Sequence, residues 1–300
     1  MHTLTIVAMF KNESLVIREW IEHHLSCGVQ HIYLIDNGST DNYMSTLQPY
    51  VNSRTVTLVH DPQRFERDTI DVKKWNEKTN TCTRVPRDNA HTHLHLLNEH
   101  FLEVLKTEAE WVWVIDIDEY VYSTAHSLRD LVATVDPEVS EIWTPWKIFG
   151  SNGHNYQPSS IREGFSKRMS HESFKLRVME HGRARGHGKT CTRVSTIRRL
   201  GIHQCEIRPG VTMLPDGTKV KDKTELNNWF ENWTPAPTDI AFCNHYMVMS
   251  EQYFKECKMK REGGAGRPHD AKSMRKYWIR NNANDESDTL ILSTKHHTPE

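Results

Sequence analysis

The sequence predicts an α/β protein in which helices flank a mostly parallel central sheet. Short apolar runs alternate with amphipathic helical segments through the first 60 residues, a pattern typical of a parallel, doubly wound sheet with right-handed crossovers. The apolar run Trp111–Ile115 is typical of a strand buried on both faces. Neither an internal repeat nor a low-complexity linker divides the 300 residues, so we expect a single domain.

The composition is that of an ordinary globular protein, with 37% hydrophobic and 26% charged residues. The 38 basic and 39 acidic residues nearly cancel, which argues against a nucleic-acid partner. No apolar run approaches the roughly 20 residues of a membrane span, and no signal peptide is evident. Six scattered cysteines without a Cys-x-x-Cys pair suit a reducing compartment. We therefore expect a soluble, cytoplasmic protein.

Three strands and two helices account for the first 60 residues. The strands are expected at 4–10, 31–35 and 55–60. The first helix should be capped by Asn12 or Ser14 and should end with Gly28 at its C′ position. The second helix should be capped by Ser39 or Thr40.

A polar segment and one long helix precede the central apolar run. Residues 61–87 predict a long irregular loop, and residues 88–106 predict an amphipathic helix. His91 and His95 lie one helical turn apart, which would permit a metal site. A polar helix face is the interpretation we favour for these histidines.

The second half of the chain is less regular. Strands are expected at 141–149, 190–200 and 240–249, a short helix at 128–132, helices after Ser250 and Asp270, long loops at 206–240, and a peripheral tail at 281–300. The sequence pattern predicts no helix or strand for residues 155–190.

Acidic residues follow the strand at 111–115. Ligands of open α/β sheets bind at the carboxyl ends of the strands. On an extended chain Asp116 and Asp118 would share one face, with Ile117 turned into the core. Two hard oxygen ligands on one face suit Mg²⁺ or Mn²⁺. The alternative is an acidic turn after a core strand, without a ligand.

Three strand ends should converge at one edge of the sheet, namely the turns at Asn12-Glu13, at Asp36 and at Asp116 to Asp118. The Asp36 carboxylate could accept hydrogen bonds from a base or ribose. The later acids could hold a metal that neutralises a leaving diphosphate. This combination is what a nucleotide-sugar site requires.

Several motifs of this chain resemble glycosyltransferase family 92 and related family-2-like enzymes. They are Lys11-Asn12-Glu13, 19–24, Gly28-Val29, 36–41, 111–120, 149–154, His245-Tyr246 and a late group comprising Ser250, Phe254, Lys258 and 261–264. The resemblance implies a GT-A fold, a UDP- or GDP-sugar donor, Mn²⁺ or Mg²⁺, and transfer with inversion to a glycan or other hydroxyl acceptor. We expect one domain over residues 1–280, with a donor half at 1–122 and an acceptor half at 123–280.

The resemblance also implies roles for individual residues. Asp36 would lie at the nucleoside, Asp116 at the ribose and metal, and Asp118 on the metal itself. His245 would be a further metal ligand. The alternative is a buried histidine hydrogen-bonded beside Tyr246.

Basic residues are expected to meet the diphosphate. Lys258 and Arg261 would reach it from a closing helix or loop, and Arg87 is a further candidate. The alternative is a solvated basic face. Asn12 and Glu13 are expected to contact the donor, with a plain helix cap as the alternative.

Inverting transfer needs a general base to accept the proton of the acceptor hydroxyl. Spacing singles out no residue, and Glu172, His203 and Asp270 are all possible. Glu163 and His154 are the preferred candidates, because the glycine-punctuated loop that they follow should border the acceptor.

We therefore expect a hexosyl- or pentosyltransferase, and two other classes compete with it. One is a non-catalytic module that binds glycans or nucleotides on the same scaffold. The other is an Asp-x-Asp phosphatase, which would carry the motif on its first strand and Thr or Val two residues after the second Asp. Here the motif lies on the fourth strand and Tyr120 holds that position.

Overall fold

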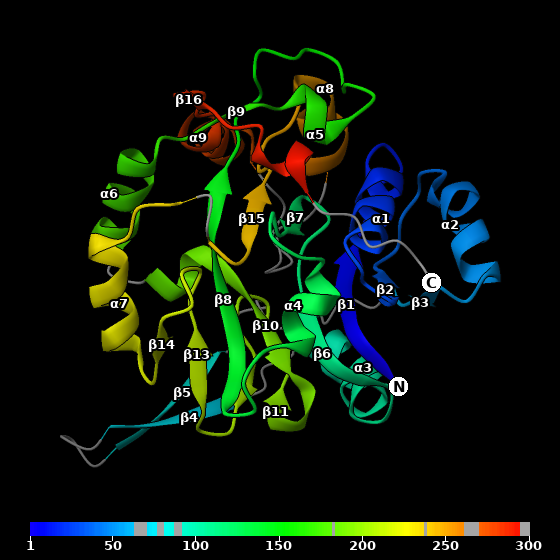
Figure 1. The fold of residues 1–300 in the computed structure, drawn as a ribbon. Helices are drawn as coiled ribbons and strands as arrows, with labels where there is room; N and C mark the ends of the chain where they lie inside the picture. Colours follow the sequence, from blue (N-terminus) through cyan, green and yellow to red (C-terminus); the bar gives the residue numbers. More distant parts are fainter. Residues whose placement is uncertain are drawn as a thin grey trace.

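The computed structural model describes residues 1–62, 71–76, 81–86, 92–181, 184–236, 239–260 and 270–294. Ten of the described strands form one twisted sheet, with helices packed on both sides of it (Figure 1). Within the described chain, every helix is too short or too polar to cross a membrane.

The main sheet has the path β14-β13-β8-β10-β6-β1-β2-β3, with β15 and β7 attached beside β8. Its strands are β1 (His2–Phe10), β2 (His31–Asp36), β3 (Val56–His60), β6 (Ala109–Val114), β7 (Glu119–Tyr122), β8 (Val139–Ile148), β10 (Gly188–Arg193), β13 (Val211–Met213), β14 (Lys219–Val220) and β15 (Phe242–His245). Three small sheets pair β4 (Asp71–Asn76) with β5 (Thr81–Pro86), β9 (Lys167–Arg168) with β16 (Glu286–Ser287), and β11 (Ile197–Arg199) with β12 (Glu206–Ile207).

The α-helices are α1 (Ile17–Ser26), α2 (Tyr43–Asn52), α3 (Thr92–Glu108), α4 (Leu128–Ala133), α5 (Ile161–Gly164), α6 (His171–His181), α7 (Lys223–Asn232), α8 (Glu251–Tyr253) and α9 (Ala271–Asn281). Short 3-10 helices are η1 (Ala184–His187), η2 (Val194–Thr196) and η4 (Leu290–Ser293), and η3 (Phe254–Lys258) is a π-helical turn that continues α8.

The predicted α/β class is confirmed. Strands β6, β1, β2 and β3 are neighbours and all parallel, so their carboxyl ends lie along one edge. Strand β10 runs antiparallel between β6 and β8, which makes the second half of the sheet mixed. The apolar runs form these strands because both faces are covered: Trp111 and Trp113 in β6 are almost completely buried.

The predicted helix caps were wrong, although both helices exist. Helix α1 follows Val16 and α2 follows Asn42, and neither residue makes a side-chain cap. The polar groups that we expected at the caps join the two loops instead, since Asn12 N–H donates to Ser39 Oγ over 2.9 Å. Gly28 ends α1 as predicted. Its φ is 97°, and its N–H donates a hydrogen bond to the carbonyl of Leu25.

Several segments expected to be loops contain regular structure. Within 61–87, residues 71–76 and 81–86 form the antiparallel pair β4–β5, and 206–240 holds β13, β14 and α7. Conversely, the strands expected at 190–200 and 240–249 are shorter than predicted. These short strands carry mixed polar residues, and their partner strands decide their conformation more than their own composition does.

The segment after α9 is not peripheral over residues 282–294. Strand β16 pairs with β9, and the Asp288 carboxylate lies 3.0 Å from Lys147 Nζ and 2.7 Å from Arg168 Nε. Ile291 is buried. Charge pairing inside the protein anchors this polar segment, which its composition does not reveal. Residues 295–300 lie outside the described part.

Candidate active site

Asp116 and Asp118 lie in the tight turn that joins β6 to β7. The N–H of Glu119 donates to the carbonyl of Asp116 over 3.0 Å, so the acids sit on a turn and not on an extended strand. Ile117 is buried, as expected. The turn lies at the carboxyl edge of the parallel strands (Figure 1), the edge at which ligands bind in such sheets.

Lys189 joins two of the acids from the neighbouring strand β10. Its side chain is 0% exposed, and Nζ lies 3.0 Å from both Asp116 Oδ2 and Glu119 Oε2. A third hydrogen bond runs to the carbonyl of Ile202 over 2.8 Å. All three ammonium donors are therefore used, and Lys189 holds the two carboxylates in place.

Asp118 is held by residues from the end of the chain. Its Oδ2 accepts a hydrogen bond from Lys258 Nζ of η3 and lies 3.5 Å from His245 Nε2. The other imidazole nitrogen of His245 is 3.7 Å from Glu119 Oε1. The His245 ring packs edge-on against Trp146, with the ring centroids 4.5 Å apart.

Strand pairing places His245 beside the acids. Strands β7 and β15 are antiparallel, and Glu119 is the register partner of His245. The next N–H, from Tyr246, donates to the carbonyl of Asp118 over 2.8 Å. The predicted nearness of His245 to Asp118 therefore depends on a long-range strand pair.

The charges of this cluster shift one another's proton affinities. Burial alone would raise the pKa of Asp118, but Lys258 and His245 lower that pKa well below its usual value. The pKa of Glu119 is raised, because the carboxyl group is completely buried. Burial disfavours a charged Lys189, yet Asp116 and Glu119 outweigh it and raise the pKa of Lys189. Lys189 and Asp118 are both charged at neutral pH.

The donor types at the turn fit Mg²⁺ or Mn²⁺. Among the residues that the structure describes, no three His, Cys, Asp or Glu side chains are grouped closely enough to hold a metal ion. Asp116 and Asp118 nevertheless supply hard oxygens, and the His245 nitrogen nearest to them is Nε2, 3.5 Å from Asp118 Oδ2. A divalent ion would compete with Lys258 for Asp118.

Asp36 lies at the same edge, at the end of β2. Its Oδ2 accepts hydrogen bonds from Tyr43 Oη over 2.8 Å and from His60 Nδ1 over 2.5 Å. Its Oδ1 accepts from the N–H of Ser39 over 2.8 Å. Burial alone would raise the pKa of Asp36, but these hydrogen bonds lower it.

Asn12 and Glu13 contact other parts of the chain. Asn12 has a φ of 55°, and its Oδ1 accepts from the N–H of Thr40 over 2.7 Å. Glu13 is buried and accepts from Tyr253 Oη over 2.8 Å. The two side chains thus join the β1 end to the β2 loop and to α8, and their contact with a donor stays a prediction.

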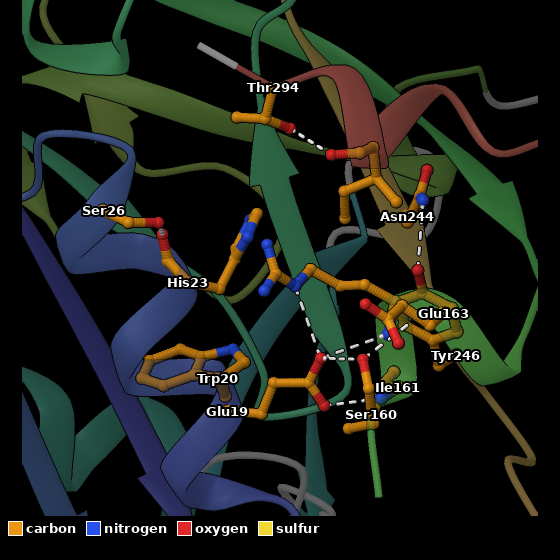
Figure 2. Close-up of polar contacts among 12 residues, drawn as sticks. Glu19, Trp20, His23, Ser26, Ser160, Ile161, Glu163, Asn244, Tyr246 and Thr294 are labelled. Carbon is orange, nitrogen blue, oxygen red and sulfur yellow. Dashed lines mark hydrogen bonds and ion pairs between the residues drawn. The ribbon is translucent and has the colours of Figure 1, made fainter. Parts of the chain in front are cut away.

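The two candidate bases lie on and beside α5. Figure 2 shows Glu19 of α1 against the first turn of α5, where it accepts from the N–H of Ile161 over 2.5 Å. Glu163 is exposed on α5. His154 Nε2 donates to the carbonyl of Gly164 over 2.8 Å.

Aromatic rings link this region to the acidic turn. The ring of His154 packs edge-on against Phe165 at 5.2 Å, and Phe165 contacts Tyr246 at 6.0 Å. The backbone of Tyr246 is the group that binds Asp118. The basic role of His154 or Glu163 stays a prediction.

Two predicted phosphate contacts, Arg87 and Arg261, fall outside the described residues.

Sequence reasoning missed Lys189 and the buried position of Glu119. The available signal was Lys189 itself, a lysine at the start of β10, the strand that pairs with β6. Three acids that lie close together in a turn need a cation nearby, so a lysine on the neighbouring strand could have been expected to pair with them.

Comparison with known proteins agrees with this geometry. The sequence profile described as Glycosyltransferase family 92 matches residues 2–292. The chain belongs to glycosyltransferase family 92, and the resemblance noted in the sequence is confirmed.

Curated relatives from plants carry the same family name. A family 92 protein of Oryza sativa subsp. japonica is 25% identical over 173 residues, which are 56% of this chain and 25% of the relative. A family 92 protein of Arabidopsis thaliana is 23% identical over 165 residues, or 53% of this chain and 24% of the relative. The aligned part of this chain thus spans about a quarter of the length of these relatives.

Solved structures show weaker similarity. Residues 1–349 of S. aureus TarS align with a TM-score of 0.33 and 14% identity, covering 64% of this chain and 47% of that one. Glucosyl-3-phosphoglycerate synthase from Mycobacterium tuberculosis, solved with Mn²⁺, UDP and glucosyl-3-phosphoglycerate, aligns with a TM-score of 0.32 and 13% identity. That alignment covers 67% of this chain and 62% of the synthase.

Proposed function

We propose that this protein is a metal-dependent GT-A glycosyltransferase that moves a hexosyl or pentosyl group from a UDP- or GDP-sugar to a hydroxyl acceptor, with inversion. The observation that carries the proposal is the placement of Asp116 and Asp118 in one turn at the carboxyl edge of the parallel strands, with His245 Nε2 3.5 Å from Asp118. Family membership supports the same class of enzyme. The donor half would be residues 1–122, and the acceptor, a glycan or glycoconjugate, would bind the half at 123–280.

Asp116, Asp118 and His245 would hold Mn²⁺ or Mg²⁺, which as a Lewis acid stabilises the leaving diphosphate. Lys189 orients Asp116 through the 3.0 Å contact, so the turn is organised before a ligand arrives. Lys258 ends a short turn that contacts Asp118. On release from Asp118 its ammonium would face the diphosphate, the role that the resemblance implied.

The acceptor hydroxyl must lose a proton as the sugar is transferred. His154 donates through Nε2 to a carbonyl, so in the neutral ring Nδ1 is the unprotonated nitrogen and can accept that proton. Glu163 is exposed on the adjacent helix α5 and offers a carboxylate for the same task. We propose that one of these two is the base.

The direct test is a thermal-shift screen of nucleotide sugars with and without Mn²⁺. A true donor stabilises the folded protein by mass action, by about 2.7 kcal/mol at a hundredfold excess over its Kd. We expect a UDP- or GDP-sugar to raise Tm only when Mn²⁺ is present. A screen in which no nucleotide sugar shifts Tm would overturn the proposal.

Hydrolysis of the donor separates an enzyme from a binding module on the same scaffold. A competent transferase slowly transfers its sugar to water, and a module that merely binds does not. We expect slow, Mn²⁺-dependent release of free sugar from the donor found in the screen. Tight donor binding without any hydrolysis or transfer would favour the module.

A further inference from the structure

The carboxylate of Asp36 is closed to a ligand in this structure. Asp36 is 0% exposed, and three donors of the chain, from Ser39, Tyr43 and His60, already bind its two oxygens. A nucleobase approaching this edge would therefore meet a different group.

The exposed residue that contacts the Asp36 carboxylate is His60. It is the last residue of β3 and the register partner of Asp36. Its side chain is 58% exposed, while its Nδ1 lies 2.5 Å from Asp36 Oδ2. The imidazole thus has one nitrogen bound to a buried carboxylate, and more than half of the side chain is exposed to solvent.

The hydrogen bond to Asp36 sets the tautomer of His60. An ionised carboxylate can only accept, so Nδ1 must carry the proton. In the neutral ring Nε2 is then unprotonated and can accept a hydrogen bond. Asp36 fixes the ring orientation as well, in the way that a carboxylate behind a histidine orients it at many functional sites.

The distance from His60 to the acidic turn suits a nucleotide. Strands β6, β1, β2 and β3 are consecutive neighbours, so three gaps of about 4.8 Å, or roughly 14 Å in all, separate the ends of β6 and β3. A nucleoside diphosphate laid along this edge, with its diphosphate at Asp118, would bring its base near His60.

We propose that His60 recognises the nucleobase of the donor by accepting a hydrogen bond from a lactam N–H through Nε2. Uracil carries such a group at N3 and guanine at N1, whereas the matching ring nitrogens of cytosine and adenine are acceptors. Asp36 and Tyr43 act as positioning residues behind His60. This inference rests on the proposed function, since it names the base-reading residue of the same site.

The test is calorimetric binding of UDP, GDP, CDP and ADP, each with Mn²⁺, to wild type and to His60→Ala. We expect wild type to prefer UDP or GDP over CDP and ADP by about tenfold, the value of one hydrogen bond. His60→Ala should bind all four about equally, at the weaker affinity. His95→Ala is the matched control, because His95 is an exposed histidine on α3 that pairs with Glu99, and it should keep the preference.

The possible failures are distinct. If wild type binds none of the four diphosphates, the proposed function falls and this inference falls with it. If wild type binds with a preference that His60→Ala retains, His60 does not read the base while the proposed function stands. A wild-type preference for CDP or ADP would also overturn the assignment, because Nε2 would then face another acceptor.

Discussion

Lys258 donates a hydrogen bond to Asp118, which lies 140 residues earlier in the chain. Both side chains are 11% exposed, so the pair is largely removed from water. The ammonium occupies a carboxylate oxygen that a divalent cation would also bind. Lys258 is therefore the counter-ion of Asp118, as Lys189 is of Asp116 and Glu119.

Replacing Lys258 by Met should strengthen Mn²⁺ binding when no nucleotide is present. The competing charge is removed, and we expect about a tenfold gain in affinity, a free-energy change of about 1.4 kcal/mol. Electron paramagnetic resonance of free Mn²⁺ measures it directly. Lys255→Met, which removes an exposed lysine paired with Glu251, should leave the affinity unchanged. Equal affinities of wild type and Lys258→Met would contradict competition at Asp118.

Asp118→Asn should abolish sugar transfer while the protein stays folded. The amide keeps the shape of the side chain but loses the charge that holds a cation. Turnover with the donor found in the screen measures the first effect, and near-ultraviolet circular dichroism measures the second. Near-native turnover of the variant would show that the metal assignment is wrong.

Lys189→Met should destabilise the fold. It leaves Asp116 and the buried Glu119 without their shared cation, and breaking such a buried pair costs about 3–5 kcal/mol. Urea unfolding measures the loss. Lys106→Met is the matched control, since Lys106 forms an exposed pair with Glu103 and its removal should change stability by less than about 1 kcal/mol. A Lys189→Met protein as stable as the control would count against this role.

Asp288 should make the protein more stable at neutral pH than in acid. Burial alone would raise the pKa of Asp288, but Lys147 and the surrounding hydrogen bonds lower it. A lowered folded pKa contributes stability above the unfolded value of about 3.9, and this contribution is lost as pH falls through the folded pKa. Urea unfolding from pH 7 to pH 3 should therefore show a steeper loss for wild type than for Asp288→Asn. Parallel curves would contradict the assignment.

The general base should be identified by comparing Glu163→Gln with His154→Gln. Loss of a general base lowers kcat by about 10²- to 10⁴-fold. One variant should show this loss in transfer to the acceptor while donor binding is retained. If both variants transfer at the wild-type rate, the base lies elsewhere.

The sequence by itself determined the parallel half of the sheet and the acidic edge. Its apolar runs are long and local, so β1, β2, β3 and β6 follow from periodicity alone. Parallel pairing then requires Asp36 and the turn at Asp116 to Asp118 to share one edge. The family motifs at 11–13, 36–41 and 111–120 lie on these strands or directly after them, which helped to identify the family from the sequence.

The tertiary structure alone decided which charges meet. Lys189 reaches Asp116 from β10, and the β7–β15 pair brings His245, which the family motifs had already placed at the metal, to the turn. Asp288 anchors a tail that looked peripheral. Short polar strands and buried ion pairs take their stability from partners distant in sequence. No local pattern encodes such partners, so they appear only when the chain is folded.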